Sequence, residues 1–200
     1  MSPTSRRSCI CLLAVLLGLV AGLDALWADG APPAAPDAMI AVPEGLDLPN
    51  AKMPAPGLVV GGQPSAEHLK RAAELGIAWV VDLRGVGELE GRDEKAEVEA
   101  LGMRYVSIPI AGKEALDRAA AERLAETLEE AASGSESSDG PRVLVHCASG
   151  NRVGGLFALK AFFVDGEDAD TALALGDAFG MRASLRPAVE ELLAPAAGHK

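Results

Sequence analysis

The sequence predicts an α/β domain with a central, mostly parallel sheet flanked by helices. Short apolar runs alternate with amphipathic stretches from residue 57 onward, which is typical of strands that alternate with helices. Hydrophobic residues make up 49% of the chain, enough for a substantial core, and aromatic residues only 4%, so the core is expected to be aliphatic. In such sheets ligands bind at the carboxyl ends of the strands, so the residues there are the first candidates for a site.

Four apolar runs are expected to be strands. Residues 58–60 end at a pair of glycines, and residues 103–108 are stopped by a proline. Residues 77–83 (IAWVVDL) form a continuous apolar run between turn signals, which suits a buried central strand. The fourth strand, residues 142–146 (RVLVH), is followed immediately by Cys147.

Six helices are expected to cover the sheet. Ser65 is a favourable N-cap for the first, which has Leu69 on its apolar face and ends at Gly76. The third is strongly amphipathic, with Leu124 and Leu128 on one face. The predicted helices span residues 65–76, 93–101, 117–131, 153–164, 169–179 and 184–193.

Composition divides the chain into three parts. Residues 1–28 resemble a signal peptide, because Arg6 and Arg7 precede an uncharged apolar run that is too short for a comfortable membrane span. Residues 29–56 hold seven Pro and seven Ala, which predicts an extended linker that forms neither helix nor sheet ladder. The catalytic domain is then expected at residues 57–195. The protein is expected to be exported, periplasmic or secreted, with an uncleaved membrane anchor as the alternative.

The formal net charge of −11 restricts the partners. A nucleic-acid-binding protein needs a cationic face to displace counterions from phosphates, so this balance argues against nucleic acid. A small anionic or phosphorylated substrate is compatible with it, because one arginine and a few backbone amides can hold a phosphate. The chain has three histidines, and one cysteine outside the N-terminal segment, so neither a metal site nor another cofactor is expected.

That cysteine, Cys147, is the strongest candidate for chemistry. Without a partner it cannot form an internal disulfide, and on count alone it would be a small buried hydrophobe. Its neighbours favour a different role, because the small residues Ala148, Ser149 and Gly150 allow successive backbone amides to turn inward before the next helix begins. Such a nest at a helix N-terminus binds an anion and stabilises a thiolate, and Arg152 adds a planar fork suited to a tetraoxo anion.

The tract HCASGNR, residues 146–152, resembles the active-site loop of cysteine-dependent phosphatases of the protein tyrosine phosphatase superfamily and of rhodanese-type sulfurtransferases. The stretch GGQPS (61–65), with the later VDLR (81–84), resembles a bacterial family of phosphatase-like domains associated with beta-lactamase-like hydrolases. The likeness covers nearly all of residues 57–193 and implies a cysteine-phosphatase-like fold. It also implies roles for individual residues: Cys147 as nucleophile, Arg152 as anion clamp, His146 as support behind the loop, and the amides of Ala148, Ser149, Gly150, Asn151 and Arg152 as the anion cradle.

Two departures from the phosphatase pattern keep the reaction open. Tyrosine-phosphatase loops place five residues between Cys and Arg, whereas this chain has four, the rhodanese spacing. Val153 stands where phosphatase loops commonly have Ser or Thr, which assists the leaving thiolate. The first hypothesis is hydrolysis of phosphate esters through a phosphocysteine at Cys147. The alternatives are sulfur transfer through a Cys147 persulfide, and a non-catalytic module that senses an anion or redox state.

A phosphatase also needs a general acid. Asp117 is the only Asp on the expected loop, residues 108–117, although it is also a natural helix N-cap. Glu114 is a lesser candidate, and Lys113 could contact an anionic substrate. Glu88 is expected either to orient Arg152 or to be solvated.

Overall fold

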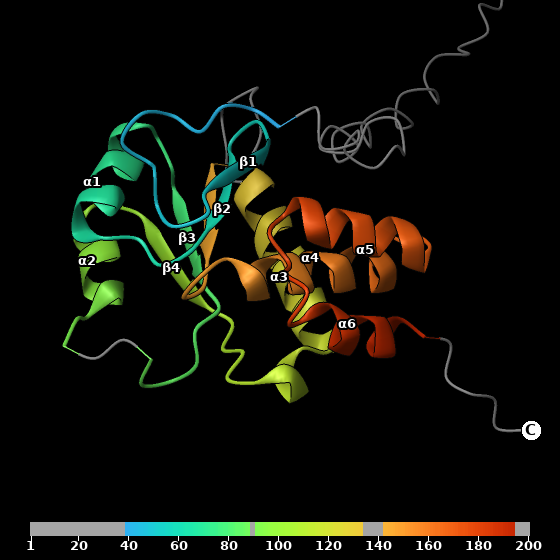
Figure 1. Cartoon of the computed structure of the whole chain (residues 1–200). Coiled ribbons are helices and arrows are strands. Elements are labelled where there is room, and N and C mark those ends of the chain that lie inside the picture. Colours follow the sequence, from blue (N-terminus) through green and yellow to red (C-terminus); the bar gives the residue numbers. More distant parts are fainter. Residues whose placement is uncertain (1–38, 89–90, 134–141, 195–200) are drawn as a thin grey trace, which may run out of the picture. The chain divides into compact units, whose positions relative to one another are not determined.

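The computed structural model of the chain describes residues 39–88, 91–133 and 142–194. Within them, five strands form one sheet in the order β1-β2-β5-β3-β4 (Figure 1). All neighbouring pairs are parallel except β1–β2, at one edge, which confirms the predicted mostly parallel sheet. The strands are β1 (Lys52–Ala55), β2 (Leu58–Gly61), β3 (Trp79–Asp82), β4 (Arg104–Ser107) and β5 (Val143–His146).

The register of the sheet brings three strand ends together. His146, the last residue of the central strand β5, pairs with Gly61 at the end of β2 and with Asp82 at the end of β3. Because these strands are parallel, the loops that follow them leave the sheet at the same edge. The segment after β5 therefore has the loops after β2 and β3 as its neighbours on either side.

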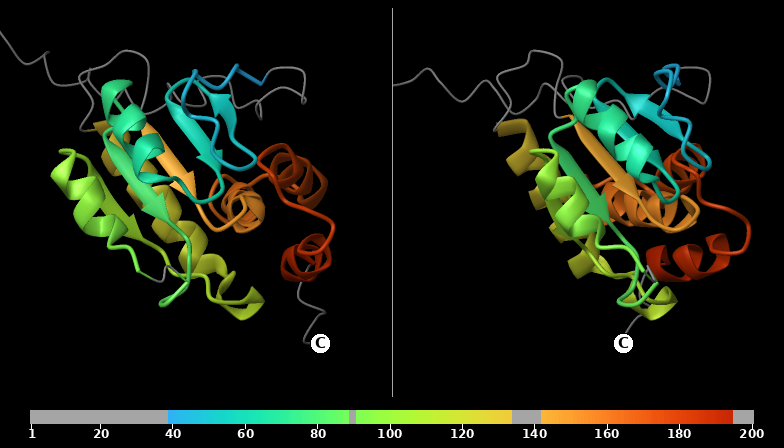
Figure 2. Two further views of the ribbon diagram at one scale, coloured as in Figure 1. Left: turned by 60° about the vertical axis from the view of Figure 1, so that its left-hand side comes forward. Right: turned by 90° about the vertical axis from the view of Figure 1, so that its left-hand side faces the viewer.

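Helices cover both faces of the sheet (Figures 1 and 2). One face carries α1 (Ala66–Glu74) and α2 (Glu94–Ala100), and the other carries α3 (Arg118–Ser133), α4 (Asn151–Phe163), α5 (Ala169–Ala178) and α6 (Arg186–Leu193). Successive residues of β5 point to opposite faces, so Leu144 joins the core under α1 and α2 whereas Val143 and Val145 join the larger core under the other helices. An apolar stripe marks helices such as α1 and α3, whereas α4 is buried at nine consecutive residues, 153–161.

The structure corrects the predicted linker, residues 29–56, over its second half. Residues 52–55 form β1, and Leu46 and Leu48 are 1% and 2% exposed. The prolines do not prevent this packing, because Pro54 lies on an edge strand, where a missing N–H is tolerated. The packed domain thus begins by residue 39. The predicted signal peptide, residues 1–28, and the first part of the linker, residues 29–38, lie outside the described residues.

No helix within the described ranges is both long and apolar enough to cross a membrane.

Close packing of α4 on the segment around α5 predicts a large effect of one methyl group. A Cβ on Gly154 would lie 2.1 Å from the backbone N of Met181 and 2.4 Å from the carbonyl O of Gly176, neither of which can move without shifting the helices. Gly154→Ala is therefore expected to lower the free energy of unfolding, measured with urea, by about 3 kcal/mol.

The neighbouring glycine offers a matched control. A Cβ on Gly155 would meet the Cδ2 methyl of Leu185 at 2.8 Å, and a side-chain methyl can rotate away. Gly155→Ala is expected to change the free energy of unfolding by less than about 1 kcal/mol, because the gain in helix propensity offsets the adjustment. Equal effects of the two substitutions would contradict the proposed packing constraint.

Candidate active site

Cys147 lies directly after β5 and is buried, with 1% of its surface exposed. Its backbone N–H donates to the carbonyl O of Gly61 at 3.3 Å, which continues the pairing of β5 with β2 by one residue. The chain then turns through Gly150, whose φ of 84° lies in the left-handed region that glycine adopts readily, and α4 begins at Asn151. The sequence expectation of a strand, a short loop and a helix is met at this point.

The thiol accepts a hydrogen bond from the loop. The N–H of Gly150 donates to Sγ of Cys147 over 3.1 Å. The N-terminus of α4 follows directly, and the first amides of any helix have no carbonyl partner within it and carry the positive end of its dipole. The sulfur therefore lies at a helix N-terminus, where backbone N–H groups can bind an anion.

Arg152 is held in one orientation by two groups from other loops. Its Nη1 and Nη2 donate to the two carboxylate oxygens of Glu88, each at 2.6 Å, and Nη1 also donates to the carbonyl O of Ile110 at 2.7 Å. The hydrogen bonds with Glu88 raise the pKa of Arg152 above its ordinary value, against the effect of burial, and the charge of nearby Cys147 acts in the same direction. The same bonds lower the pKa of Glu88.

The fork of Arg152 keeps donors for a ligand. A guanidinium carries five N–H groups, and the three contacts with Glu88 and Ile110 use three of them. The other two belong to Nε and Nη2; the side chain also has a hydrogen bond with Cys147, and it is 19% exposed. Glu88 thus fixes the plane of the guanidinium and leaves it able to bind an anion beside Cys147.

Behind Cys147 lies a buried network of charged side chains. Arg84 donates through Nε and Nη2 to Asp82, at 2.9 and 2.7 Å, and through Nη2 to Glu94 at 2.8 Å. Nε2 of His146 lies 2.7 Å from Oε1 of Glu94, although without the alignment of a hydrogen bond. Tyr105 donates its hydroxyl to Asp82 at 2.8 Å. This network surrounds His146, the residue that precedes Cys147.

The pKa shifts in the network follow from its ion pairs. Burial alone would raise the pKa of Asp82, but the hydrogen bonds from Arg84 and the charge of His146 outweigh burial and lower it. Burial alone would lower the pKa of Arg84, whereas its bonds to Asp82 and the charge of Glu94 raise it. Burial and the bond to Asp82 both raise the pKa of Tyr105. The ionised forms of Asp82 and Arg84 stabilise each other.

Three members of this network also have the donor atoms of a metal site. Ligand atoms of Asp82, Glu94 and His146 lie within 4.8 Å of one another, a cluster that sequence spacing did not indicate. The guanidinium of Arg84, with a side chain 2% exposed, already bonds to both carboxylates and supplies the positive charge that a metal would bring. These residues therefore fit an ion-pair network better than a metal centre.

The predicted general-acid candidates lie on the loop that also contacts Arg152 through Ile110. Oδ1 of Asp117 accepts the backbone N–H of Ala120 at 2.8 Å, so Asp117 caps α3, and its side chain is exposed. Lys113 and Glu114 lie in the short 3-10 helix η3 (Lys113–Ala115), where both are exposed. The helix-cap position anticipated for Asp117 is the one observed.

Sequence reasoning missed several residues that contact the loop after β5. Asn50 donates through Nδ2 to the carbonyl O of Ser149 at 3.0 Å, and Arg182 donates through Nη2 to the same oxygen at 3.3 Å. Oδ1 of Asn151 accepts the backbone N–H of Arg182 at 2.7 Å. Asn50 lies in the segment predicted to be a linker, so only its preference for tight turns could have singled it out.

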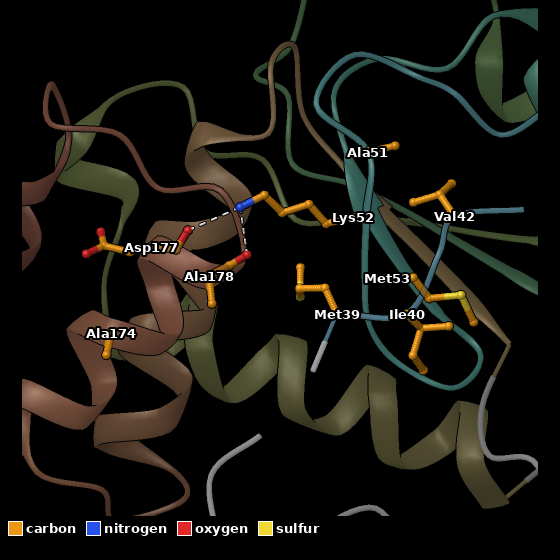
Figure 3. A pocket seen from close by; sticks show the side chains of 9 residues that line it. All are labelled: Met39, Ile40, Val42, Ala51, Lys52, Met53, Ala174, Asp177 and Ala178. Atoms are coloured by element: carbon orange, nitrogen blue, oxygen red, sulfur yellow. Dashed lines mark hydrogen bonds between the residues drawn. The ribbon is translucent and has the colours of Figure 1, made fainter. Parts of the chain in front are cut away.

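Two surface cavities lie away from the thiol. One, of about 610 Å³, is mostly apolar and lies between the residues around β1 and the end of α5; there Lys52 donates to the carbonyl oxygens of Asp177 and Ala178 (Figure 3). The other, of about 480 Å³, lies against Arg84 and the start of α2. Neither of these two cavities is lined by Cys147 or Arg152.

No protein-family model matches the sequence, and a search of curated proteins finds no significant match. Solved structures do match. A DUF442 protein from Shewanella putrefaciens is 18% identical, with a TM-score of 0.55 over 76% of this chain and 94% of its own. Pseudomonas aeruginosa TpbA is 22% identical, with a TM-score of 0.54 over 79% and 90%, and a TpbA variant has been solved in complex with phosphotyrosine. Tk-PTP is 20% identical, with a TM-score of 0.51 over 70% and 92%. At these identities the comparisons establish architecture, and this chain has the tyrosine-phosphatase-like fold.

Proposed function

We propose that this protein is a cysteine-dependent phosphatase that hydrolyses phosphate esters. The observation that carries the proposal is the joint position of Cys147, which accepts the Gly150 amide at the start of α4, and of Arg152, whose fork is fixed by Glu88. A nucleophile and an anion clamp on one short loop are what transfer of a phosphoryl group requires. The likeness to phosphatase structures supports the same reading.

The reaction would proceed in two displacements. Sγ of Cys147 attacks phosphorus, a sulfur–phosphorus bond forms, and the ester oxygen leaves with the bonding electron pair. Asp117 is the candidate to protonate that oxygen, on the loop that also contacts Arg152 through Ile110. Water then gives a proton back to Asp117 and attacks phosphorus, the sulfur–phosphorus bond breaks, and phosphate and the thiolate are released. The loop amides and Arg152 stabilise the charge on the equatorial oxygens throughout.

Sulfur transfer through a Cys147 persulfide is the second candidate. Four residues separate Cys147 from Arg152, and the smaller ring suits one transferable sulfur atom. Val153 is buried and offers no hydroxyl to the thiolate. The rival activity uses the same residues, so only a comparison of substrates separates the two.

One preparation of the full chain tests both activities. Release of p-nitrophenol from p-nitrophenyl phosphate reports phosphatase activity, and conversion of thiosulfate and cyanide to thiocyanate reports sulfur transfer. Phosphate release that disappears in a Cys147→Ser variant supports the proposal, whereas Cys147-dependent thiocyanate without phosphate release would replace it with the second candidate. If neither product forms but calorimetry shows that phosphate or thiosulfate binds, the protein is an anion-sensing module.

We also propose that the protein acts outside the cytoplasm. The charge and hydropathy pattern of residues 1–28 supports export. Recovery of the protein from the periplasmic or secreted fraction, with its new N-terminus near residue 29 by sequencing, would support it. An intact N-terminus in the membrane fraction would favour the anchor instead, and recovery from the cytoplasm would exclude export.

The pair Glu88–Arg152 yields a prediction about turnover. Glu88→Gln keeps the shape of the side chain but removes the charge and one acceptor, so Arg152 loses its fixed orientation. We expect kcat for p-nitrophenyl phosphate to fall about tenfold while KM changes less, since orientation counts most in the transition state. The pair Arg92–Glu97 provides a control, because Arg92 also binds Glu97 through two nitrogens but elsewhere on the domain. Equal kinetics of Glu88→Gln and Glu97→Gln would contradict the positioning role.

A further inference from the structure

An anion-binding loop needs its carbonyl groups held as firmly as its amides. When successive N–H groups turn inward to a ligand, the carbonyls of the same peptides turn away from it and require donors of their own. Here the carbonyl O of Ala148 accepts the backbone N–H of Gln63 at 3.3 Å, and that of Ser149 accepts the side-chain amide of Asn50 at 3.0 Å. These donors come from other parts of the chain, so residues outside the loop hold its carbonyl groups in place.

The hydrogen bond from Asn50 to the carbonyl O of Ser149 affects the neighbouring N–H that donates to the thiol. The carbonyl of Ser149 and the N–H of Gly150 belong to one peptide unit, which is planar, and in a trans peptide the oxygen and the hydrogen point in opposite directions. Asn50 binds the oxygen, and the N–H on the other side donates to Sγ of Cys147 at 3.1 Å. A donor that fixes the oxygen thereby aims the N–H at the sulfur.

The backbone of Asn50 adopts a left-handed conformation, which is energetically unfavourable for most residues. Its φ is 56°, and among the residues that the structure describes it is the only non-glycine residue with a positive φ. The left-handed region is disfavoured for residues with a Cβ, and glycine would occupy it more easily. Compared with glycine at this position, asparagine has one additional contact, the hydrogen bond from its side-chain amide to Ser149.

The segment that carries Asn50 is fixed against the domain. Leu48 is 2% exposed, and the carbonyl O of Pro49 accepts the backbone N–H of Gly62. Gly62 in turn forms an isolated antiparallel bridge with Ser149. A Cβ on Gly62 would lie 2.9 Å from the carbonyl O of Pro49 and 3.0 Å from that of Ala148, so the turn before β1 and the loop after β5 both pack closely against Gly62.

We infer that Asn50 is a positioning residue for the anion cradle, which makes the segment before β1 part of the functional site. Its side-chain amide holds the peptide between Ser149 and Gly150 so that the N–H faces Cys147. Arg182 shares the task through a longer contact of 3.3 Å with the same carbonyl. The geometric part of this inference stands by itself, and its consequence for phosphate binding and turnover rests on the proposed function.

Asn50→Gly tests the inference sharply, because it removes the donor and relieves the left-handed backbone, so the melting temperature should not fall. Hydrogen exchange of the peptide that covers residues 147–153 is expected to become about three- to tenfold faster, the equivalent of one hydrogen bond. Affinity for inorganic phosphate, measured by calorimetry, should fall by a similar factor. Asn50→Asp, which tolerates the same φ but cannot donate, should behave alike or worse.

The control is Asp47→Asn, a change of similar size in the same segment before β1, at a side chain that is 90% exposed. It should alter neither exchange nor phosphate affinity. Unchanged exchange in both Asn50 variants would overturn the inference. Faster exchange in a protein that binds no phosphate, even as the native chain, would support the positioning role while it removes the proposed function, so the two failures are distinguishable.

Discussion

Replacement of Cys147 by serine is expected to lower phosphatase turnover by about 10⁴-fold or more while the protein still folds and binds phosphate. A serine hydroxyl is scarcely ionised at neutral pH, so it cannot replace a thiolate as nucleophile. The substitution is nearly isosteric in a site that is 1% exposed, and the Gly150 amide can donate to Oγ as it does to Sγ. Steady-state kinetics and phosphate calorimetry on the two proteins measure both halves of the expectation.

A control must show that the loss of activity comes from removing Cys147 and not from removing any cysteine of the chain. The chain has two other cysteines, Cys9 and Cys11, near its N-terminus. A Cys9→Ser, Cys11→Ser double variant should retain full turnover, and intact-mass analysis after rapid acid quench should find one phosphate on its remaining cysteine. Turnover that survives in Cys147→Ser would show that hydrolysis uses another nucleophile.

Arg84→Met should have the largest effect on stability. It leaves the carboxylates of Asp82 and Glu94, which are 5% and 2% exposed, without the guanidinium that bonds to both. Removing one partner from a buried ionic network typically costs about 3–5 kcal/mol, so we expect a loss of that size in the free energy of unfolding at pH 7, measured with urea. Lys95→Met removes an exposed partner of Glu99 and should cost less than about 1 kcal/mol.

A second substitution and a pH series identify the cause of that loss. In the Arg84→Met background, Glu94→Gln removes one of the two stranded charges and should restore part of the stability, so the two changes are not additive. A loss below about 1 kcal/mol in Arg84→Met, or additive losses in the double variant, would show that the network does not stabilise the fold as described.

The pH dependence has opposite signs in the two proteins. In the native protein the pKa of Asp82 is lowered, so its stabilisation is complete above the unfolded value of about 3.9 and is lost as pH falls through the lower folded value. Without Arg84, burial is expected to raise the pKa of Asp82, so stability should be retained at low pH and lost as pH rises. The penalty of Arg84→Met should therefore shrink from pH 7 toward pH 4.

The elements that could be predicted from the sequence are those whose signals are local. Strand β5 follows from an apolar run that stops at a polar loop, and α1 from the Ser65 cap, whose hydroxyl accepts the N–H of His68 at 3.1 Å. The site loop was predictable for the same reason, since Cys147, Gly150 and Arg152 are close together in the sequence.

What could not be predicted depends on contacts between distant segments. The strand β1 was missed because seven prolines and seven alanines dominate its surroundings, whereas two buried leucines, Leu46 and Leu48, determine the packing. The contact of Glu94 with His146 joins the start of α2 to the end of β5, and neither segment has a sequence pattern that predicts it. Asn50 acts on Ser149 from the opposite end of the domain sequence, and no spacing rule connects them.

The sheet order also has a consequence for how the protein folds. The strands β2 and β3 do not pair with each other, because each pairs with β5, which comes last of the five in the chain. Before β5 inserts, β1–β2 and β3–β4 are two separate pairs with open edges, and closing them requires contacts over long sequence separations, which is slow. The cysteine and the arginine of the site follow β5 directly. Completion of the sheet and assembly of the candidate site are therefore expected in one folding step, so a chain in which β5 has not yet inserted lacks the loop geometry around Cys147.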